Sequence, residues 1–258
     1  MNKIKIIFFD IDGTLIDMQK KEITERTVET LRRLQERGIL ICIATGRTPT
    51  TVPRFEGVEF DAFLTFNGSY CYNQKEDIYA NPIPAEDVKQ LLANAADMNR
   101  PVSIATRNRI AANGKDVDLV DYFAIAKEEV VVADDFEQVV QEDVYQMMLG
   151  CIGEERVRLL EGVKNAKLAA WWDRAVDVIP GDSGKGIGVE QLLRYYHLDQ
   201  SEAMAFGDGN NDIEMLQAVG AGVAMENASP ELKAVATEIC GHVAEDGVYH
   251  YCLEHGFI

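Results

Sequence analysis

The stretch IKIIFFDIDGT, residues 4–14, decides the fold class of this chain. Residues 4–9 are mostly isoleucine and phenylalanine, and the run stops at Asp10 and the turn-forming pair Asp12-Gly13. A short, continuous apolar run of this kind predicts a strand that is buried on both faces, as in a parallel sheet. Because ligands bind beyond the carboxyl ends of strands in open α/β sheets, the two aspartates stand at an expected binding edge.

The same pattern continues outward from this strand. Thr24 suits the N-cap of a helix that Gly38 would end, and the apolar runs at residues 39–44 and 62–66 predict two further strands. Strand, helix and strand at this spacing form a βαβ unit, whose strands lie parallel. We therefore predict a parallel sheet wrapped by helices.

The pattern changes after Pro82. Strand-like runs follow in pairs, with helices between them, which indicates an open α+β layer. The runs span residues 102–106, 110–113, 145–152, 168–172 and 175–179, and one of the helices is expected at residues 154–163. After a loop-rich break the alternation of helices and strands resumes. We predict an α/β fold in which residues 1–82 and 182–258 form a Rossmann-like, doubly wound core and residues 83–181 form an inserted cap domain.

Composition and charge narrow the classes of partner. Of the 258 residues, 47% are hydrophobic and 26% are charged, which is typical of a folded globular protein. The chain holds 25 basic and 43 acidic residues, a formal net charge of −18 that repels nucleic acids and anionic membranes. We expect a small-molecule partner, neither nucleic acid nor membrane, and a chain that is a monomer or a small homo-oligomer.

Two further features favour the cytoplasm. No stretch reaches the ~18 to 20 apolar residues that a membrane-spanning helix needs, and the first residues lack the cleavage site of a secretory signal. The five cysteines are odd in number and contain no Cys-x-x-Cys pair, which argues against a disulfide framework or a zinc site. We therefore predict reduced cysteines that pack in the interior and a cytoplasmic location.

Two acidic clusters follow predicted strands. Side chains two positions apart on a strand point the same way, so Asp10 and Asp12 can face one pocket. Neighbouring carboxylates both stay ionised only when a cation lies between them. The second cluster, GDGNND, follows the strand-like residues 203–206 and adds Asp208 and Asp212. Because ligation by oxygen alone favours Mg²⁺, the two clusters together predict a magnesium site.

Two shorter motifs offer groups that suit a phosphate. ATGR, residues 44–47, ends a predicted strand, where the Thr45 hydroxyl and exposed N–H groups near Gly46 can meet a phosphate oxygen. Lys185, within SGKG, stands at a predicted helix N-terminus, which favours anions. The residues around Lys185 do not match a P-loop. Taken singly, each motif also fits an ordinary turn or helix start.

The ordered set DIDGT, ATGR, SGKG and GDGNND resembles the haloacid dehalogenase superfamily of phosphohydrolases. Residues 245–248, with the sequence EDGV, also look like the end of the Cof-type sugar phosphatases of subfamily IIB. The interval between Asp12 and Thr45 is filled by one loop and one helix and has no room for a cap. The insertion therefore falls between Thr45 and Lys185, which is similar to the Cof-type branch.

The resemblance implies a phosphatase that forms an aspartyl-phosphate. Asp10 would attack phosphorus, while Asp12 would protonate the leaving oxygen and then take a proton from the attacking water. Mg²⁺ would be held by Asp10, Asp208 and the backbone carbonyl of Asp12. Asp212 would be a further ligand or an anchor behind the ligands. The residues implied in binding the phosphoryl group are Thr45, Gly46, Lys185 and Asn211.

The cap is expected to close over the site and to select the group that carries the phosphate. Trp171 and Trp172 adjoin on a predicted strand and point to opposite faces; we interpret both as core residues, although one could stack on a sugar. Asn67-Gly68 resembles a loop near the phosphate in the Cof-type branch and equally fits a turn before a hairpin. The candidates for substrate specificity are Asn67, Gly68, Arg107, Arg109, Trp172, Arg174 and Asp177.

Two other functions fit part of this pattern. A phosphosugar mutase of the phosphomannomutase type shares the cap position and the aspartate pair, but it needs a second phosphate site, which Arg107, Arg109 and Arg174 would have to supply. A non-catalytic metal-binding regulatory module would need a defective site, whereas every expected catalytic side chain is present. We therefore predict a Mg²⁺-dependent phosphatase of small phosphorylated metabolites, with sugar phosphates as the expected class.

Overall fold

The computed structural model describes residues 4–125, 128–169 and 172–258 of the chain. These residues form two compact units. The first unit comprises Met1–Arg47, Val52–Ala80 and Gly184–Ile258, and the second comprises Thr48–Thr51 and Asn81–Ser183. Most of the second unit is thus one segment inserted between two parts of the first.

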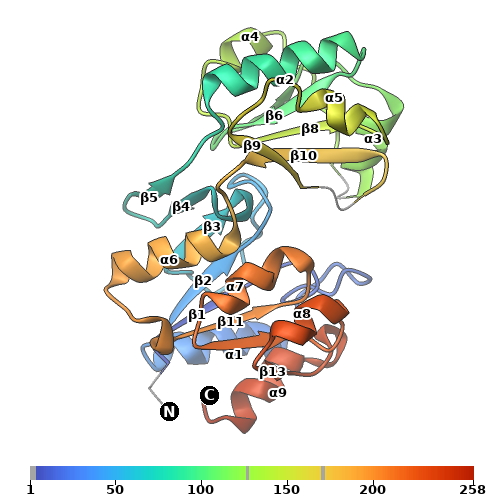
Figure 1. Cartoon of the computed structure of the whole chain (residues 1–258). Helices are drawn as coiled ribbons and strands as arrows, with labels where there is room; N and C mark the ends of the chain where they lie inside the picture. Colours follow the sequence, from blue (N-terminus) through green and yellow to red (C-terminus); the bar gives the residue numbers. More distant parts are fainter. Residues whose placement is uncertain (1–3, 126–127, 170–171) are drawn as a thin grey trace. The chain divides into compact units, whose positions relative to one another are not determined.

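An eight-stranded sheet forms the centre of the first unit (Figure 1). The strand order is β13-β12-β11-β1-β2-β3-β4-β5, and the strands from β13 to β3 lie parallel. The strands are β1 (Ile6–Phe9), β2 (Leu40–Ala44), β3 (Ala62–Thr65), β4 (Tyr70–Tyr72), β5 (Asp77–Ala80), β11 (Ala203–Gly207), β12 (Ala221–Ala224) and β13 (Glu238–Ile239). The predicted doubly wound sheet is confirmed, and β1 and β11 are neighbours where the strand order reverses.

Helices cover both faces of this sheet. In Figure 1, α7 lies above β1 and β11, while α1 and α9 lie below them. The helices of this unit are α1 (Glu25–Glu36), α6 (Lys185–Tyr196), α7 (Ile213–Gln217), α8 (Pro230–Val235) and α9 (Gly247–Glu254). The predicted ends of α1 are confirmed: the Thr24 hydroxyl accepts a hydrogen bond from the N–H of Thr27, and Gly38 follows the helix with a φ of 73°.

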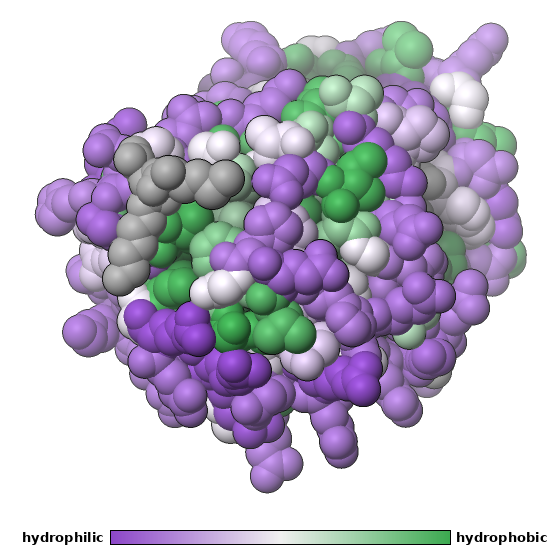
Figure 2. Space-filling view, turned by 90° about the horizontal axis from the view of Figure 1, so that it is seen from below, coloured by the Kyte–Doolittle hydropathy of each residue, from purple (hydrophilic) through white to green (hydrophobic). Residues whose placement is uncertain are grey.

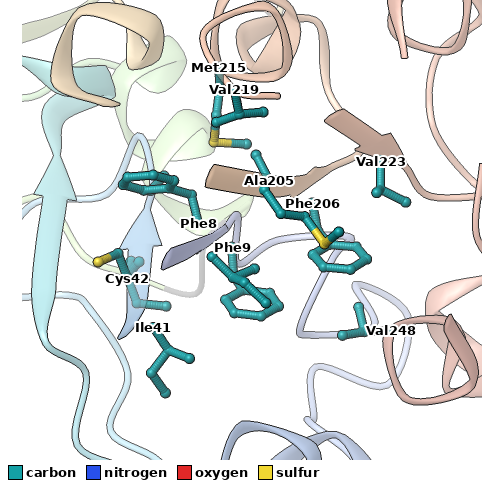
Figure 3. Packing of buried hydrophobic residues seen from close by; sticks show 14 of the residues in the cluster. Phe8, Phe9, Ile41, Cys42, Ala205, Phe206, Met215, Val219, Val223 and Val248 are labelled. Atoms are coloured by element: carbon teal, nitrogen blue, oxygen red, sulfur yellow. The ribbon is translucent and has the colours of Figure 1, made fainter. Parts of the chain in front are cut away.

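The strand that opens the chain is apolar on both sides because each side meets a helical layer. Phe8 and Phe9 are fully buried and point to opposite faces (Figure 3). Phe8 lies on the side of Met215, while Phe9 stacks on Phe206 with 5.4 Å between ring centroids, on the side of Val248. Burying one such ring stabilises the fold by about 1.5–3 kcal/mol. The core therefore fixes the positions of β1 and β11 relative to each other, and with them the starting points of the loops that follow these two strands.

The second unit is built on an antiparallel sheet with the order β7-β6-β8-β10-β9. Its strands are β6 (Val102–Ala105), β7 (Ile110–Ala112), β8 (Gln146–Gly150), β9 (Ala166–Ala169) and β10 (Ala175–Pro180), and its helices are α2 (Ala85–Asp97), α3 (Val117–Ile125), α4 (Phe136–Val139) and α5 (Glu155–Leu159). Buried apolar residues of α2, α4 and α5 form a separate core with residues of the strands. Figure 1 shows this sheet with α2 and α4 on one side of it. The predicted separate α+β layer is confirmed.

Two expectations for this unit are wrong in detail. β9 ends at Ala169, and Trp172 lies in a bend and is half-buried, so it is not a strand residue of the core. The Trp172 ring instead packs against the guanidinium of Arg174, 5.0 Å from its centroid. Trp171 lies outside the described residues. The helix expected at residues 154–163 ends at Leu159, because the chain turns at Gly162 with a φ of 77°.

Two observations concern the surface and the cysteines. Within the residues that the structure describes, no helix has both the length and the apolar character needed to cross a membrane. Hydrophilic side chains cover most of the face shown in Figure 2, with smaller apolar areas between them. All five cysteines are free and buried, as expected for residues that pack in the interior.

Candidate active site

Four loops of the first unit meet beyond the carboxyl ends of the parallel strands. They follow β1, β2, β3 and β11, which are neighbours in the sheet. The loops hold residues 10–14, 45–47, 66–68 and 208–212. Parallel neighbours end at the same edge, so motifs that are far apart in the sequence become adjacent there.

Lys185 joins the first and the last of these loops. Its Nζ donates hydrogen bonds to Oδ1 of Asp10 and to Oδ1 of Asp212, at 2.6 Å each. The lysine side chain is completely buried, and both aspartates are almost completely buried. Burial alone would lower the pKa of Lys185, but the negative charges of Asp10 and Asp212 outweigh it and raise the pKa. Lys185 is therefore a fixed cation at the base of the site.

The carboxylates outnumber this cation. Burial raises the pKa of Asp10 well above its usual value, Lys185 opposes that rise, and the charges of Asp212 and Asp208 add to it. Burial, again with a contribution from the charge of Asp212, raises the pKa of Asp208 to about 7. One lysine thus neutralises only part of the charge, and full ionisation of the cluster requires a further cation.

The oxygens of this cluster are close enough to share that cation. One carboxylate oxygen each from Asp10, Asp208 and Asp212 lies within 4.8 Å of the others. The donor set is entirely oxygen, which suits a hard divalent ion such as Mg²⁺. The residues present therefore fit a divalent metal.

Asp212 also shapes the loop that carries Asp208. Its Oδ2 accepts hydrogen bonds from the backbone N–H groups of Asp208 and Gly209, at 3.0 Å each. With Oδ1 bonded to Lys185, both oxygens of Asp212 have partners. These contacts hold Asp212 and the loop of Asp208 in a fixed arrangement.

Asp12 points to a different partner. Arg47 binds its carboxylate with two hydrogen bonds, from Nε at 2.8 Å and from Nη2 at 2.6 Å. Such a bidentate pair fixes the orientation of both side chains. The side chain of Asp12 is about one-third exposed, and its carboxylate is not one of the three that form the metal-binding cluster.

The expected phosphate-binding residues gather around Asn67. Its backbone N–H donates to the carbonyl of Thr45 at 3.0 Å, and its side-chain Oδ1 accepts from Asn211 Nδ2 at 3.1 Å. A Cβ atom at Gly46 would lie only 3.1 Å from the Asn67 amide, so the glycine allows this approach. Gly68, with a φ of 94°, packs so closely on the backbone before Lys185 that a side chain would not fit. Thr45, Gly46, Asn67, Gly68 and Asn211 therefore lie together.

The other specificity candidates belong to the second unit. Arg109 pairs with Asp135 at 2.8 Å and with Glu142 at 3.2 Å. Arg174 pairs with Asp118 at 2.7 Å and with Asp121 at 2.9 Å. These two arginines are therefore bound to acidic side chains within their own unit. Arg107 is exposed.

Tyr122 connects three of these candidates. Its hydroxyl donates a hydrogen bond to Oδ1 of the buried Asp177 at 2.6 Å, and its ring lies 6.3 Å from that of Trp172. Trp172 in turn lies over the guanidinium of Arg174. The structure thus brings Trp172, Arg174 and Asp177 into one cluster and leaves Arg109 with separate partners.

Three residues that contact the predicted site residues were not themselves predicted from the sequence. Arg47 stands inside the ATGR motif, so its position after β2 could have suggested a partner among the aspartates. Asn227 follows β12, another parallel strand that ends at the same edge, and contacts the loops after β1 and β11. Tyr122 has no signal in the sequence, because only the packing of α3 brings it to Asp177.

Comparison with known proteins gives four similarities. The profile of the haloacid dehalogenase-like hydrolases matches residues 7–252. The putative phosphatase YkrA of Bacillus subtilis is 33% identical over 256 residues, covering 98% of each chain. The 5-amino-6-(5-phospho-D-ribitylamino)uracil phosphatase YitU of the same species is 28% identical, covering 97% of each chain. The solved structure of the HAD subclass IIB sugar phosphatase BT4131 has a TM-score of 0.85 and 29% identity, covering 98% of this chain and 100% of the other.

Proposed function

The chain belongs to the haloacid dehalogenase-like hydrolase family and is a phosphatase, and we propose that it hydrolyses phosphate monoesters of small metabolites with the help of Mg²⁺. Sugar phosphates are the proposed substrate class. Two relatives support this class, because one is a sugar phosphatase and the other acts on a phosphoribitylamino compound. In both, by name, the phosphate-bearing part is a sugar or a sugar-derived chain.

One observation supports the proposal most directly. Asp10, Asp208 and Asp212 converge from two loops, and the buried Nζ of Lys185 lies 2.6 Å from two of them. Placing two buried carboxylates and the partly buried Asp208 around one lysine is costly unless a further cation compensates their charge. A magnesium ion meets this requirement.

We assign the nucleophile to Asp10. Its Oδ1 is held by Lys185, and among the described residues no donor contacts Oδ2. Oδ2 would attack phosphorus, the bond from phosphorus to the leaving oxygen would break, and an aspartyl-phosphate would form. Water would then attack the same phosphorus, release inorganic phosphate and restore the carboxylate.

Asp12 would manage the protons of both steps. It would protonate the leaving oxygen in the first step and take a proton from the attacking water in the second. The bidentate contact with Arg47 would hold the carboxyl group in one orientation for both transfers.

Asp10, Asp208 and the backbone carbonyl of Asp12 would hold the ion, and Asp212 would anchor the loop of Asp208. Bound there, Mg²⁺ would neutralise charge on the transferring phosphoryl group. Lys185 would supply a second positive charge from the protein itself. The residues that would bind the remaining phosphoryl oxygens are Thr45, Gly46 and Asn211.

We propose that residues 83–181 act as the cap that selects the leaving group, with Trp172, Arg174 and Asp177 as its first candidates. Asn67 and Gly68 would contribute from the core. A mutase would need a second phosphate site, and the ion pairs of Arg109 and Arg174 make them poor donors for one. A cytoplasmic location and a monomeric or small homo-oligomeric state remain predictions.

The test is a screen of phosphorylated metabolites for release of inorganic phosphate, with and without Mg²⁺. Wild-type protein should release phosphate from at least one sugar phosphate, and EDTA should stop the release. The Asp10→Asn variant should fold and show no turnover, because an amide is a poor nucleophile. Phosphorus NMR distinguishes the alternatives: exchange between sugar phosphate isomers that depends on a bisphosphate would support a mutase, and no reaction with any substrate would support a binding module.

A further inference from the structure

Asn227 joins three segments of the first unit through a single amide group. Its Nδ2 donates a hydrogen bond to the backbone carbonyl of Gly13 at 2.8 Å and lies 3.5 Å from Oδ2 of Asp208. Its Oδ1 accepts a hydrogen bond from the backbone N–H of Val243 at 3.0 Å. The amide therefore touches the loop after β1, the loop after β11 and the segment before α9.

The chemistry of these partners determines how the amide is oriented. The N–H of Val243 can only donate, so the amide oxygen must face it. The NH₂ group then faces the carbonyl of Gly13 and the carboxylate of Asp208, both of which can only accept. No other small side chain offers an acceptor on one side and two N–H bonds on the other.

The carboxylate of Asp208 has few other contacts that fix its position. Thr14 donates a hydrogen bond to Oδ1 at 3.3 Å, and Oδ2 lies so near Gly13 that a Cβ atom there would be 2.1 Å away. Asn227 thus contacts the same oxygen that packs against the first loop. Its amide ties that oxygen to the backbone of the loop that also carries Asp10 and Asp12.

The backbone around Asp208 is held independently of this side chain. The N–H of Met225 donates to the carbonyl of Gly207 at 2.9 Å, and the N–H of Ser229 donates to the carbonyl of Asp208 at 3.0 Å. Neither bond uses the side chain of Asn227. A truncated side chain should therefore free the Asp208 carboxylate while leaving its loop in place.

We infer that Asn227 is a positioning residue of the metal site, which fixes the Asp208 carboxylate against the first loop before the ion binds. This inference rests on the proposed metal-dependent function. Partners that lie behind metal ligands usually change metal affinity by about 10- to 100-fold when they are removed. Asn227 should contribute at the lower end of this range, because its contact with Asp208 is long.

The test measures Mg²⁺ binding by calorimetry in the absence of substrate, for wild-type protein and for Asn227→Ala. The variant should bind Mg²⁺ about tenfold more weakly. In steady-state assays it should need more Mg²⁺ for half-maximal activity and recover most of its kcat at saturating Mg²⁺. If the alanine variant does not fold, Asn227→Ser takes its place, because a serine hydroxyl is too short to reach Gly13 and Val243 together.

Gln200→Ala is the matched control. The Gln200 amide also donates to two backbone carbonyls, those of Gln217 and Val219, but before β11, at the opposite end of the strand from Asp208. Its loss should lower stability without changing the Mg²⁺ affinity. Equal Mg²⁺ affinity in wild type and Asn227→Ala would overturn the inference, whereas a wild-type protein that binds no Mg²⁺ would instead overturn the proposed function.

Discussion

Replacing Lys185 with methionine removes the buried positive charge and keeps nearly the same side-chain length. Lys185 is completely buried and contacts Asp10 and Asp212 at 2.6 Å each, so the variant leaves two buried carboxylates without their cation. Removing one partner of a buried ion pair costs about 3–5 kcal/mol. This is a large part of the ~5–15 kcal/mol that usually stabilises a protein.

Urea unfolding in EDTA, followed by tryptophan fluorescence and circular dichroism, measures this loss. The midpoint of Lys185→Met should fall by about 1 M or more. Mg²⁺ should raise the midpoint of the variant above its value in EDTA, since at 100 times its Kd a bound ligand adds about 2.7 kcal/mol. The control is Lys75→Met on the exposed surface of the same unit, which should change stability by less than ~0.5 kcal/mol. A loss below ~1 kcal/mol for Lys185→Met would refute the idea that its charge supports the carboxylate cluster.

Three further predictions follow from single contacts. Arg47→Lys cannot form the bidentate bond to Asp12, so kcat should fall, by up to ~10²-fold, with an unchanged Mg²⁺ requirement; a wild-type kcat would contradict the orienting role. Gly68→Ala would place a Cβ atom 2.1 Å from a backbone oxygen and should cost more than ~2 kcal/mol in urea unfolding, whereas Gly38→Ala, which also has a positive φ but no atom within 4 Å, should cost only about 1–2 kcal/mol. The folded-state pKa of Asp208 is raised from 3.8 to about 7, so the folded protein binds the proton of this carboxyl group more tightly than the unfolded chain does. The urea midpoint in EDTA should therefore fall as the pH rises from about 4 to 7. A midpoint that rises over this interval would be inconsistent with the raised pKa.

The parallel sheet was predictable because its signals are local. The apolar run before Asp10 needs burial on both faces, and a helix capped at Thr24 must pack its own apolar stripe. These demands leave few arrangements other than a doubly wound sheet. β13 gave no such signal, because its two residues, Glu238 and Ile239, are both exposed and depend on pairing with β12.

The convergence of the core motifs was also predictable. Asp10, Thr45 and Asp208 each follow a strand, and parallel strands end at one edge of the sheet. The hydrogen bonds that hold the side chains of the site in place were harder to predict. The contact between Arg47 and Asp12 and the triple contact of Asn227 depend on distances across loops, which no spacing in the sequence encodes.

The second unit shows more clearly that contacts between distant side chains cannot be predicted from the sequence. Trp172 was expected to be a core residue, yet it packs at the surface on Arg174 beside Tyr122. Arg109 and Arg174 looked like free cations in the sequence, and acidic side chains far along the chain pair with both of them. The charge available to a substrate therefore depends on partners that only folding brings near.

Patterns between near neighbours in the chain specify which strands are buried, where they end, and therefore which acidic residues stand at the binding edge. Periodicity and capping carry this information because they act between residues a few positions apart. How each functional group is held follows from the packing of distant segments, which places Lys185 between Asp10 and Asp212, Arg47 on Asp12, and Asn227 between two loops. Hydrogen bonds and ion pairs require contact within about 3 Å, and that proximity exists only after distant segments have packed.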